Sequence, residues 1–178
     1  IRCIAVACFV LRKTAAGVEV LLLERSDDLF HGAWCPVTGK IEGSETGWAA
    51  AVREVTEETG LVPWSLFTAD YCDQFYNAYE NMIETLPIFV AFVSNDSRVV
   101  IGPEHTQFEW LPMDEASGTA SFLGHKLALQ HIAAVFAGDE PPGWLRVSEY
   151  AVWFSQYSVG VPRGYLPHWC RIALSVVI

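Results

Sequence analysis

The chain has 178 residues, of which 52% are hydrophobic and 13% aromatic, enough apolar material for one sizeable core. Its formal net charge of −10 argues against non-specific binding to nucleic-acid backbone, which needs clustered Lys and Arg. No apolar run approaches the roughly 20 residues that cross a membrane, so we expect no membrane partner. Five cysteines, an odd number without C-x-x-C spacing, indicate reduced thiols in a cytoplasmic protein.

Hydrophobic periodicity and turn residues predict alternating strands and helices along the chain. Residues 26–39 are expected to be largely loop, and the strand at 87–93 to be central because it is almost continuously apolar. Mixed strands with two helices indicate an α/β fold, an α/β/α sandwich with a mixed β-sheet. We expect strands at 4–11, 18–24, 67–75, 87–93 and 107–111, and helices at 44–59 and 121–136.

The predicted helix at 44–59 has recognisable ends and a narrow apolar stripe. Ser44 is the expected N-cap, with Glu45 at the positive end of the helix, and Gly60 is the expected stop. At roughly 100° per residue, Val52 and Val55 lie on one side together with Trp48 and Ala51. This stripe should pack against the sheet.

Three carboxylates share an arc of roughly 100° beside that stripe: Glu54, Glu57 and Glu58. Carboxylates so close together repel one another unless a cation lies among them. Oxygen ligands suit Mg²⁺, with Mn²⁺ as a substitute, and no Cys/His cluster indicates zinc. The alternative interpretation is a solvated acidic helix face.

The stretch from Gly39 to Leu61 reads GKIEGSETGWAAAVREVTEETGL and resembles the signature of the Nudix hydrolases, G-x5-E-x7-R-E-U-x-E-E-x-G-U, in which U is aliphatic. Every defined position matches. The resemblance implies a Nudix fold over about residues 2–138 and metal-dependent hydrolysis of a phosphoanhydride. Arg53 is expected to be structural and to hold Glu45 by ion pairing within the motif, with a phosphate clamp as the alternative.

A narrower resemblance involves residues 34–46 and 104–111, which are similar to the bacterial dATP and dihydroneopterin triphosphate pyrophosphohydrolases. Those enzymes cut a triphosphate between the α and β phosphorus atoms and release a monophosphate and pyrophosphate. Position by position, this resemblance implies metal and catalytic roles for Glu54, Glu58 and Glu104, with Glu57 a further ligand or part of the same field.

The same resemblance implies a substrate-binding role for Arg25 and for the Thr38–Gly39 backbone. Arg25 has an alternative as a surface ion-pair partner of Asp27 or Asp28. Glu104, beside a Gly-Pro turn, has one as an exposed loop carboxylate. For His105 and His125, ordinary surface or core roles are expected.

Two features depart from the narrower family. The segment 77–85 is shorter and less basic than that family's substrate loop, and residues 141–178 form an aromatic-rich extension. We therefore expect a Nudix domain at 1–140 and an extension at 141–178 that packs on that domain or on a partner subunit, with a homodimer as one possibility.

Three functions remain open at this point. The leading hypothesis is a nucleoside or pterin triphosphate pyrophosphohydrolase that uses Mg²⁺. The second is a diadenosine polyphosphate hydrolase, which would need an open cleft with room for two bases. The third is a Nudix-fold module that senses a nucleotide without hydrolysing it. All three imply a small nucleotide or pterin polyphosphate as the ligand.

Overall fold

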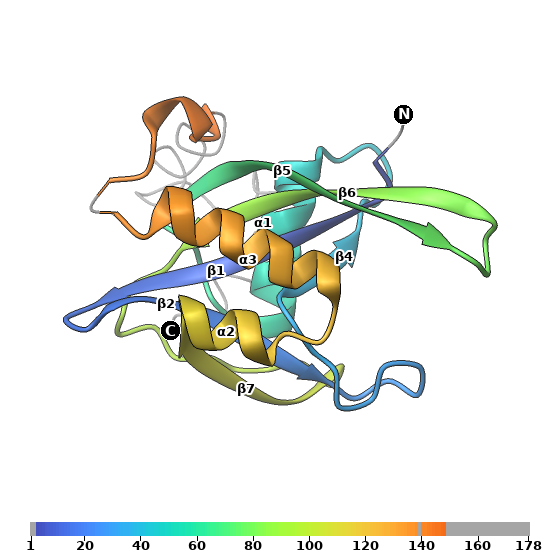
Figure 1. Ribbon diagram of the computed structural model, residues 1–178, viewed down its shortest axis with the longest axis horizontal. Coiled ribbons are helices and arrows are strands. Elements are labelled where there is room, and N and C mark those ends of the chain that lie inside the picture. Colours follow the sequence, from blue (N-terminus) through green and yellow to red (C-terminus); the bar gives the residue numbers. More distant parts are fainter. Residues whose placement is uncertain (1–2, 139, 149–178) are drawn as a thin grey trace, which may run out of the picture.

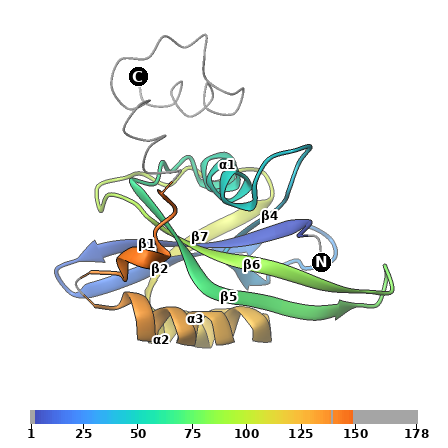
Figure 2. The same cartoon turned by 90° about the horizontal axis from the view of Figure 1, so that it is seen from above.

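A computed structural model describes residues 3–138 and 140–148 of the chain. Seven strands in these residues form one sheet, with helix α1 (Gly47–Thr59) on one face and helices α2 (Met113–Thr119) and α3 (Leu123–Phe136) on the other (Figures 1 and 2). The α/β/α sandwich expected from the sequence is confirmed.

The sheet is mixed because β1 runs parallel to β6, whereas the other pairs of neighbouring strands are antiparallel. The main strand order is β3-β2-β1-β6-β5, with β4 paired to β1 and β7 paired to β2. The strands are β1 (Ala5–Thr14), β2 (Gly17–Arg25), β3 (Trp34–Cys35), β4 (Val37–Lys40), β5 (Ser65–Asn77), β6 (Met82–Phe92) and β7 (His105–Pro112).

The core has two layers, one on each face of the sheet. Strand β1 sends Phe9 toward α2 and α3 and its neighbour Val10 toward α1, and both are almost fully buried. Successive strand residues point to opposite faces, so a strand covered on both sides is apolar throughout. Strand β6 follows the same rule, which explains its almost continuous apolar run.

Helix α1 ends where predicted but begins later. Gly60 adopts the left-handed conformation, with φ of 68°, and its N–H caps the helix on Thr56. The prediction of Ser44 as N-cap was wrong: Thr46 is the cap, and its Oγ1 accepts from the Ala49 N–H at 3.3 Å. Glu45 therefore precedes the helix, and its side chain accepts hydrogen bonds from the Glu42 N–H and from Arg53 of α1.

Four short elements were not predicted, one of which is the 3₁₀ helix η1 (Gly143–Leu145). The expected loop at 26–39 holds β3 and most of β4, which are only two and four residues long and flank Pro36. Helix α2 is short and contains Gly118, so its sequence carries a weak signal. The segment around 77–81 closes a hairpin of β5 and β6 that projects beyond the rest of the sheet (Figure 1).

The start of the aromatic-rich extension packs on the outer end of β5. Leu145 is buried in the core, and the Val147 N–H donates to the Leu66 carbonyl at 2.9 Å. The remainder of the extension, and the predicted partner contact through it, lie outside the described residues. No helix in the described part of the chain is long and apolar enough to cross a membrane.

Candidate active site

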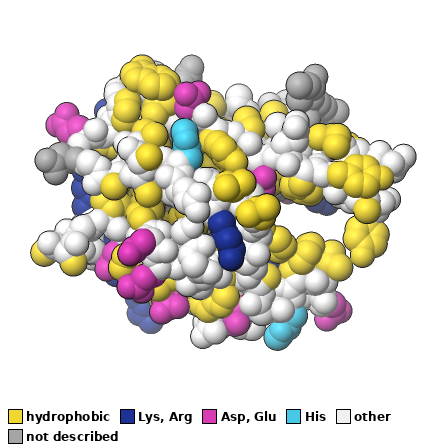
Figure 3. Space-filling view, in the orientation of Figure 1, with side chains coloured by type: hydrophobic (Ala, Val, Ile, Leu, Met, Phe, Trp, Pro, Cys, Tyr) yellow, Lys and Arg dark blue, Asp and Glu magenta, His cyan; other side chains and the backbone are white. Residues whose placement is uncertain are grey.

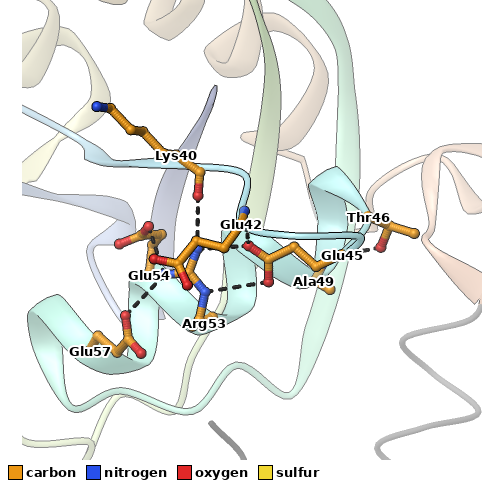
Figure 4. Close-up of polar contacts among 8 residues, drawn as sticks. All are labelled: Lys40, Glu42, Glu45, Thr46, Ala49, Arg53, Glu54 and Glu57. Carbon is orange, nitrogen blue, oxygen red and sulfur yellow. Dashed lines mark hydrogen bonds and ion pairs between the residues drawn. The ribbon is translucent and has the colours of Figure 1, made fainter. Parts of the chain in front are cut away.

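Arg53 of α1 is buried and lies at the centre of a group of ion pairs (Figure 4). Its Nη2 donates to Glu45 Oε1 at 2.8 Å and to the Lys40 carbonyl at 2.8 Å, which joins the loop before α1 to the helix. Its Nη1 donates to Glu54 at 2.8 Å and to Glu57 at 3.0 Å. One guanidinium thus fixes three carboxylates through the fork geometry that lysine lacks.

Glu58 is the most buried of the acidic side chains of α1. Its Oε2 has no hydrogen-bond partner among the described residues and lies 3.7 Å from His105 Nε2. Burial first, and then the nearby carboxylates of Glu54 and Glu104, raise the pKa of Glu58 to about 9. A buried acid with one unpartnered oxygen is costly, and a cation at this position would offset that cost.

Glu54 lies against strand β4. A Cβ atom at Gly39 would be 1.9 Å from Glu54 Cδ, so only glycine leaves room for this carboxylate. Burial raises the pKa of Glu54 above its ordinary value, while Arg53 opposes the rise. The Thr38 backbone, one residue earlier, forms a hydrogen bond with Glu58 that works against the rise in the pKa of Glu58. Strand β4 therefore contacts both acids.

Glu104 approaches the same acids from the loop before β7. The loop is tied to α1 because the Gly102 N–H donates to the Glu58 carbonyl at 2.9 Å, and to β2 because the Ser26 N–H donates to the Glu104 carbonyl at 2.9 Å. The Glu104 side chain is exposed, yet it lines the cleft and its charge raises the pKa of both Glu54 and Glu58.

Arg25 lies at the end of β2, where a bulge shifts the register with β7 between Glu24 and Arg25. Bulges commonly re-aim a side chain beside an active site. Arg25 Nε is 2.5 Å from Asp27 Oδ2, so the expected surface pair forms with Asp27. Arg25 also lines the cleft, and its charge opposes the rise in the pKa of Glu58. Both alternatives for this residue therefore have a structural basis.

The donor chemistry of this group fits a hard divalent cation, because the converging side chains offer carboxylate oxygens. Within residues 3–138 and 140–148, no three acidic, His or Cys side chains already stand as ligands of one ion, and Arg53 binds Glu54 and Glu57. The unpartnered, buried Glu58 Oε2 is the observation that favours a cation here.

Glu54, Glu57 and Glu104 line one side of a cleft with a volume of about 1150 Å³. Figure 3 shows the surface hollowed between the β5–β6 hairpin and the loop that follows β2. Away from the acids, the lining is largely aromatic and aliphatic, which suits a planar ring. This part of the lining includes Phe30, Tyr71, Phe75, Leu86, Phe122 and Leu127.

Sequence reasoning gave His105 an ordinary surface or core role, and the structure places it, buried, beside Glu58. Its adjacency to Glu104 was the only signal in the sequence. The aromatic lining of the cleft had no signal in the sequence. Phe30 and Phe122 meet edge to face, with ring centroids 5.3 Å apart, only because the tertiary fold brings them together.

Comparisons with known proteins show the family of the chain. The family model of the NUDIX domain matches residues 1–133. The chain is 28% identical over 136 residues to the asymmetrical bis(5′-nucleosyl)-tetraphosphatase of Caenorhabditis elegans, covering 75% of this chain and 96% of that relative. It is 33% identical over 117 residues to the Sus scrofa enzyme of the same name, covering 64% and 78%.

Solved structures give the same result. A binary complex of the C. elegans Ap4A hydrolase is similar with a TM-score of 0.65 at 25% identity, covering 75% of this chain and 97% of that one. The E. coli dihydroneopterin triphosphate pyrophosphohydrolase has a TM-score of 0.62 at 23% identity, covering 76% and 95%, and supports the fold alone. The chain belongs to the Nudix family and is a Nudix pyrophosphohydrolase.

Proposed function

We propose that the enzyme hydrolyses a nucleoside polyphosphate with Mg²⁺ or Mn²⁺, and that a dinucleoside tetraphosphate is favoured over a triphosphate. The observation that carries this proposal is the cleft of about 1150 Å³, acidic on one side and aromatic on the other. It is larger than the roughly 300–1,000 Å³ of an ordinary small-molecule pocket. The names of the C. elegans and Sus scrofa relatives support the same preference over the triphosphate hypothesis.

In this proposal Glu54, Glu58 and Glu104 hold the cation, and Glu57 contributes to the same negative field. The bound cation would neutralise phosphate charge and lower the pKa of an attacking water. Arg53 orients Glu54 and Glu57 through the bonds described above. Glu45 keeps Arg53 in place, so these two residues act on structure and not on substrate.

Arg25 and the Thr38–Gly39 backbone are the proposed contacts to the phosphate chain. All three line the cleft on the acidic side. Arg25 bonds Asp27 through Nε, and the planar fork of its guanidinium suits phosphate oxygens.

The proton of the attacking water needs an ionised acceptor, and Glu54 and Glu104 are the two candidates. Burial raises the pKa of Glu54, and Arg53 holds one of its oxygens. Glu104 is exposed to solvent. The pH–rate profiles of Glu54→Gln and Glu104→Gln separate them, because loss of the general base removes the acidic limb of the profile.

The test is a product analysis with Mg²⁺ on diadenosine and diguanosine tetraphosphates, dATP, GTP and dihydroneopterin triphosphate, with Glu58→Gln as the blank. We expect a triphosphate and a monophosphate from the tetraphosphates. Faster release of pyrophosphate from a triphosphate would restore the first hypothesis. Tight binding without turnover of any substrate would make the protein a sensing module.

Cytoplasmic location also remains a proposal. It rests on Cys3, Cys8, Cys35 and Cys72, which are free thiols, as expected in a reducing compartment. Labelling these thiols in intact cells before lysis would test it.

A further inference from the structure

Two carboxylates, those of Asp73 and Glu84, lie in the largely apolar part of the cleft wall, and the Asn77 side chain already donates to Glu84. Asp73 of β5 is half-buried and lines the cleft among residues such as Tyr71, Phe75 and Phe122. Within the described part of the chain, no Lys, Arg or His pairs with it, and the Gln74 backbone forms a hydrogen bond with its carboxylate. Partial burial raises the pKa of Asp73 above its ordinary value. Its carboxylate is thus available to a ligand.

The fold sets the position of this carboxylate. Strand β5 has a bulge between Thr68 and Cys72, which redirects the strand just before Asp73. The bulge is tied to α3, because His131 Nε2 lies 2.7 Å from the Ala69 carbonyl oxygen. The His131 ring also packs on that of Tyr71, with centroids 5.4 Å apart. Strand and helix are therefore held together just before the carboxylate.

Gly124, in the first turn of α3, makes room for Asp73. A Cβ atom at position 124 would be 2.1 Å from Asp73 Oδ1 and 2.2 Å from Oδ2. The helix has no side-chain cap at Phe122. A structural role for Asp73 as an acid at the helix N-terminus is thus the alternative that a test must exclude.

The charge and the hydrogen-bonding groups of a nucleotide limit the roles that the Asp73 carboxylate can have in the cleft. A polyphosphate is anionic and the chain itself carries a formal charge of −10, so an acid away from the cation repels the phosphates. An ionised carboxylate only accepts hydrogen bonds. Guanine and pterin rings present two adjacent N–H donors to it. Adenine presents one donor beside a lone pair, which the second carboxylate oxygen repels.

We infer that Asp73 selects the ring of the substrate by accepting both N–H groups of a guanine or pterin edge, so that guanine-type substrates are preferred over adenine. This inference rests on the proposed function, because it takes the cleft as the nucleotide site. Asp73 is a specificity-determining residue in this account. It contacts the ring and takes no part in the hydrolysis.

The test compares kcat/KM for diguanosine and diadenosine tetraphosphates in the wild type and three variants. A bidentate contact discriminates between bases by about tenfold or more, so the wild type should prefer the guanine substrate by that factor. Asp73→Asn replaces one acceptor with a donor and matches adenine, and the ratio should fall at least tenfold. Asp70→Asn is the matched control: it makes the same charge change on the same strand, outside the cleft lining, and should leave the ratio unchanged.

Gly124→Ala separates selection from a purely structural role. The added methyl displaces the Asp73 carboxylate and at the same time improves helix propensity. We expect the guanine preference to fall while Tm stays the same or rises. If Asp73 only capped α3, Asp73→Asn would lower Tm and leave the substrate ratio unchanged, which would overturn the inference.

Calorimetry of guanosine and adenosine monophosphate binding tests the inference independently of the proposed function, because it measures base preference without hydrolysis. Absence of hydrolysis of either substrate by the wild type would contradict the proposed function alone. Equal binding of the two monophosphates, or tighter binding of the adenine nucleotide, would overturn the inference whatever the activity.

Discussion

The carboxylate of Glu54 lies directly against Gly39, and a Cβ atom at position 39 would fall 1.9 Å from Glu54 Cδ. The glycine that opens the sequence pattern is thus explained by the acid that lies 15 residues later in it. This contact places the acidic face of α1 on strand β4, and the geometry of the proposed cation site depends on it.

Gly39→Ala should lower kcat by at least about tenfold with little loss of stability. The clashing atoms are the end of a flexible side chain, so Glu54 moves and the backbone stays. Steady-state kinetics and thermal unfolding measure the two effects. Gly118→Ala is the control, because a Cβ there meets nothing within 4 Å. Unchanged kcat in Gly39→Ala would show that the position of Glu54 is irrelevant.

Arg53→Lys should cost about 3 kcal/mol or more of the free energy of unfolding. Arg53 is buried and shared by Glu45, Glu54 and Glu57, and lysine cannot reproduce that fork. Urea unfolding measures the loss. Arg12→Lys is the comparison, because the Arg12–Glu19 pair is partly exposed and should cost about 1 kcal/mol or less. Equal losses in the two variants would contradict the buried network.

Arg25→Ala should raise KM more than it lowers kcat, because a contact made equally to bound substrate and transition state affects mainly KM. Asp27→Ala removes the observed partner and leaves the guanidinium in the cleft wall. If Arg25 only served that pair, the two variants would show the same kinetics. We expect the KM of Asp27→Ala to stay near that of the wild type.

His125→Phe should remove part of the acid sensitivity of the fold. His125 is buried between the rings of Phe9 and Phe122, and burial lowers its pKa from 6.5 to about 4. Because the pKa of the buried ring is depressed, the unfolded state binds a proton first as the pH falls below about 6.5. The fold therefore keeps its full stability above about pH 6.5 and loses it as the pH falls toward 4. The loss amounts to about 3 kcal/mol. Urea unfolding from pH 7 to pH 4 should show a shallower decline in the variant, and parallel declines would contradict this role.

The sequence predicts an element of the fold correctly where that element is long enough to show its own apolar pattern. The apolar run at 87–93 predicted the second half of strand β6, and the apolar stripe and Gly60 predicted α1. Strands β3 and β4 are too short to show a period. The N-cap of α1 was misplaced because Ser and Thr are both good N-caps, so residue type alone does not choose between Ser44 and Thr46.

The residues of the site also differ in whether a local pattern in the sequence groups them. Glu54, Glu57 and Glu58 lie on one helix, so helical spacing alone groups them. Asp73 and Gly124 meet only because a bulge in β5 faces the start of α3. No local pattern encodes such a contact. The acidic side of the cleft could therefore be predicted from the sequence, whereas its aromatic and aliphatic side could not.

The most direct test of the cation site compares thermal unfolding of the wild type and Glu58→Gln at pH 8, with and without Mg²⁺, together with kcat. The pKa of Glu58 is raised from 4.5 to about 9, so its ionisation costs the metal-free fold stability as the pH rises through that range. Metal-free Glu58→Gln should therefore melt roughly 4 °C or more above the wild type. Mg²⁺ should raise the Tm of the wild type alone, and kcat of the variant should fall by at least about 100-fold. Equal Mg²⁺ shifts, with kcat within about threefold of the wild type, would contradict the account.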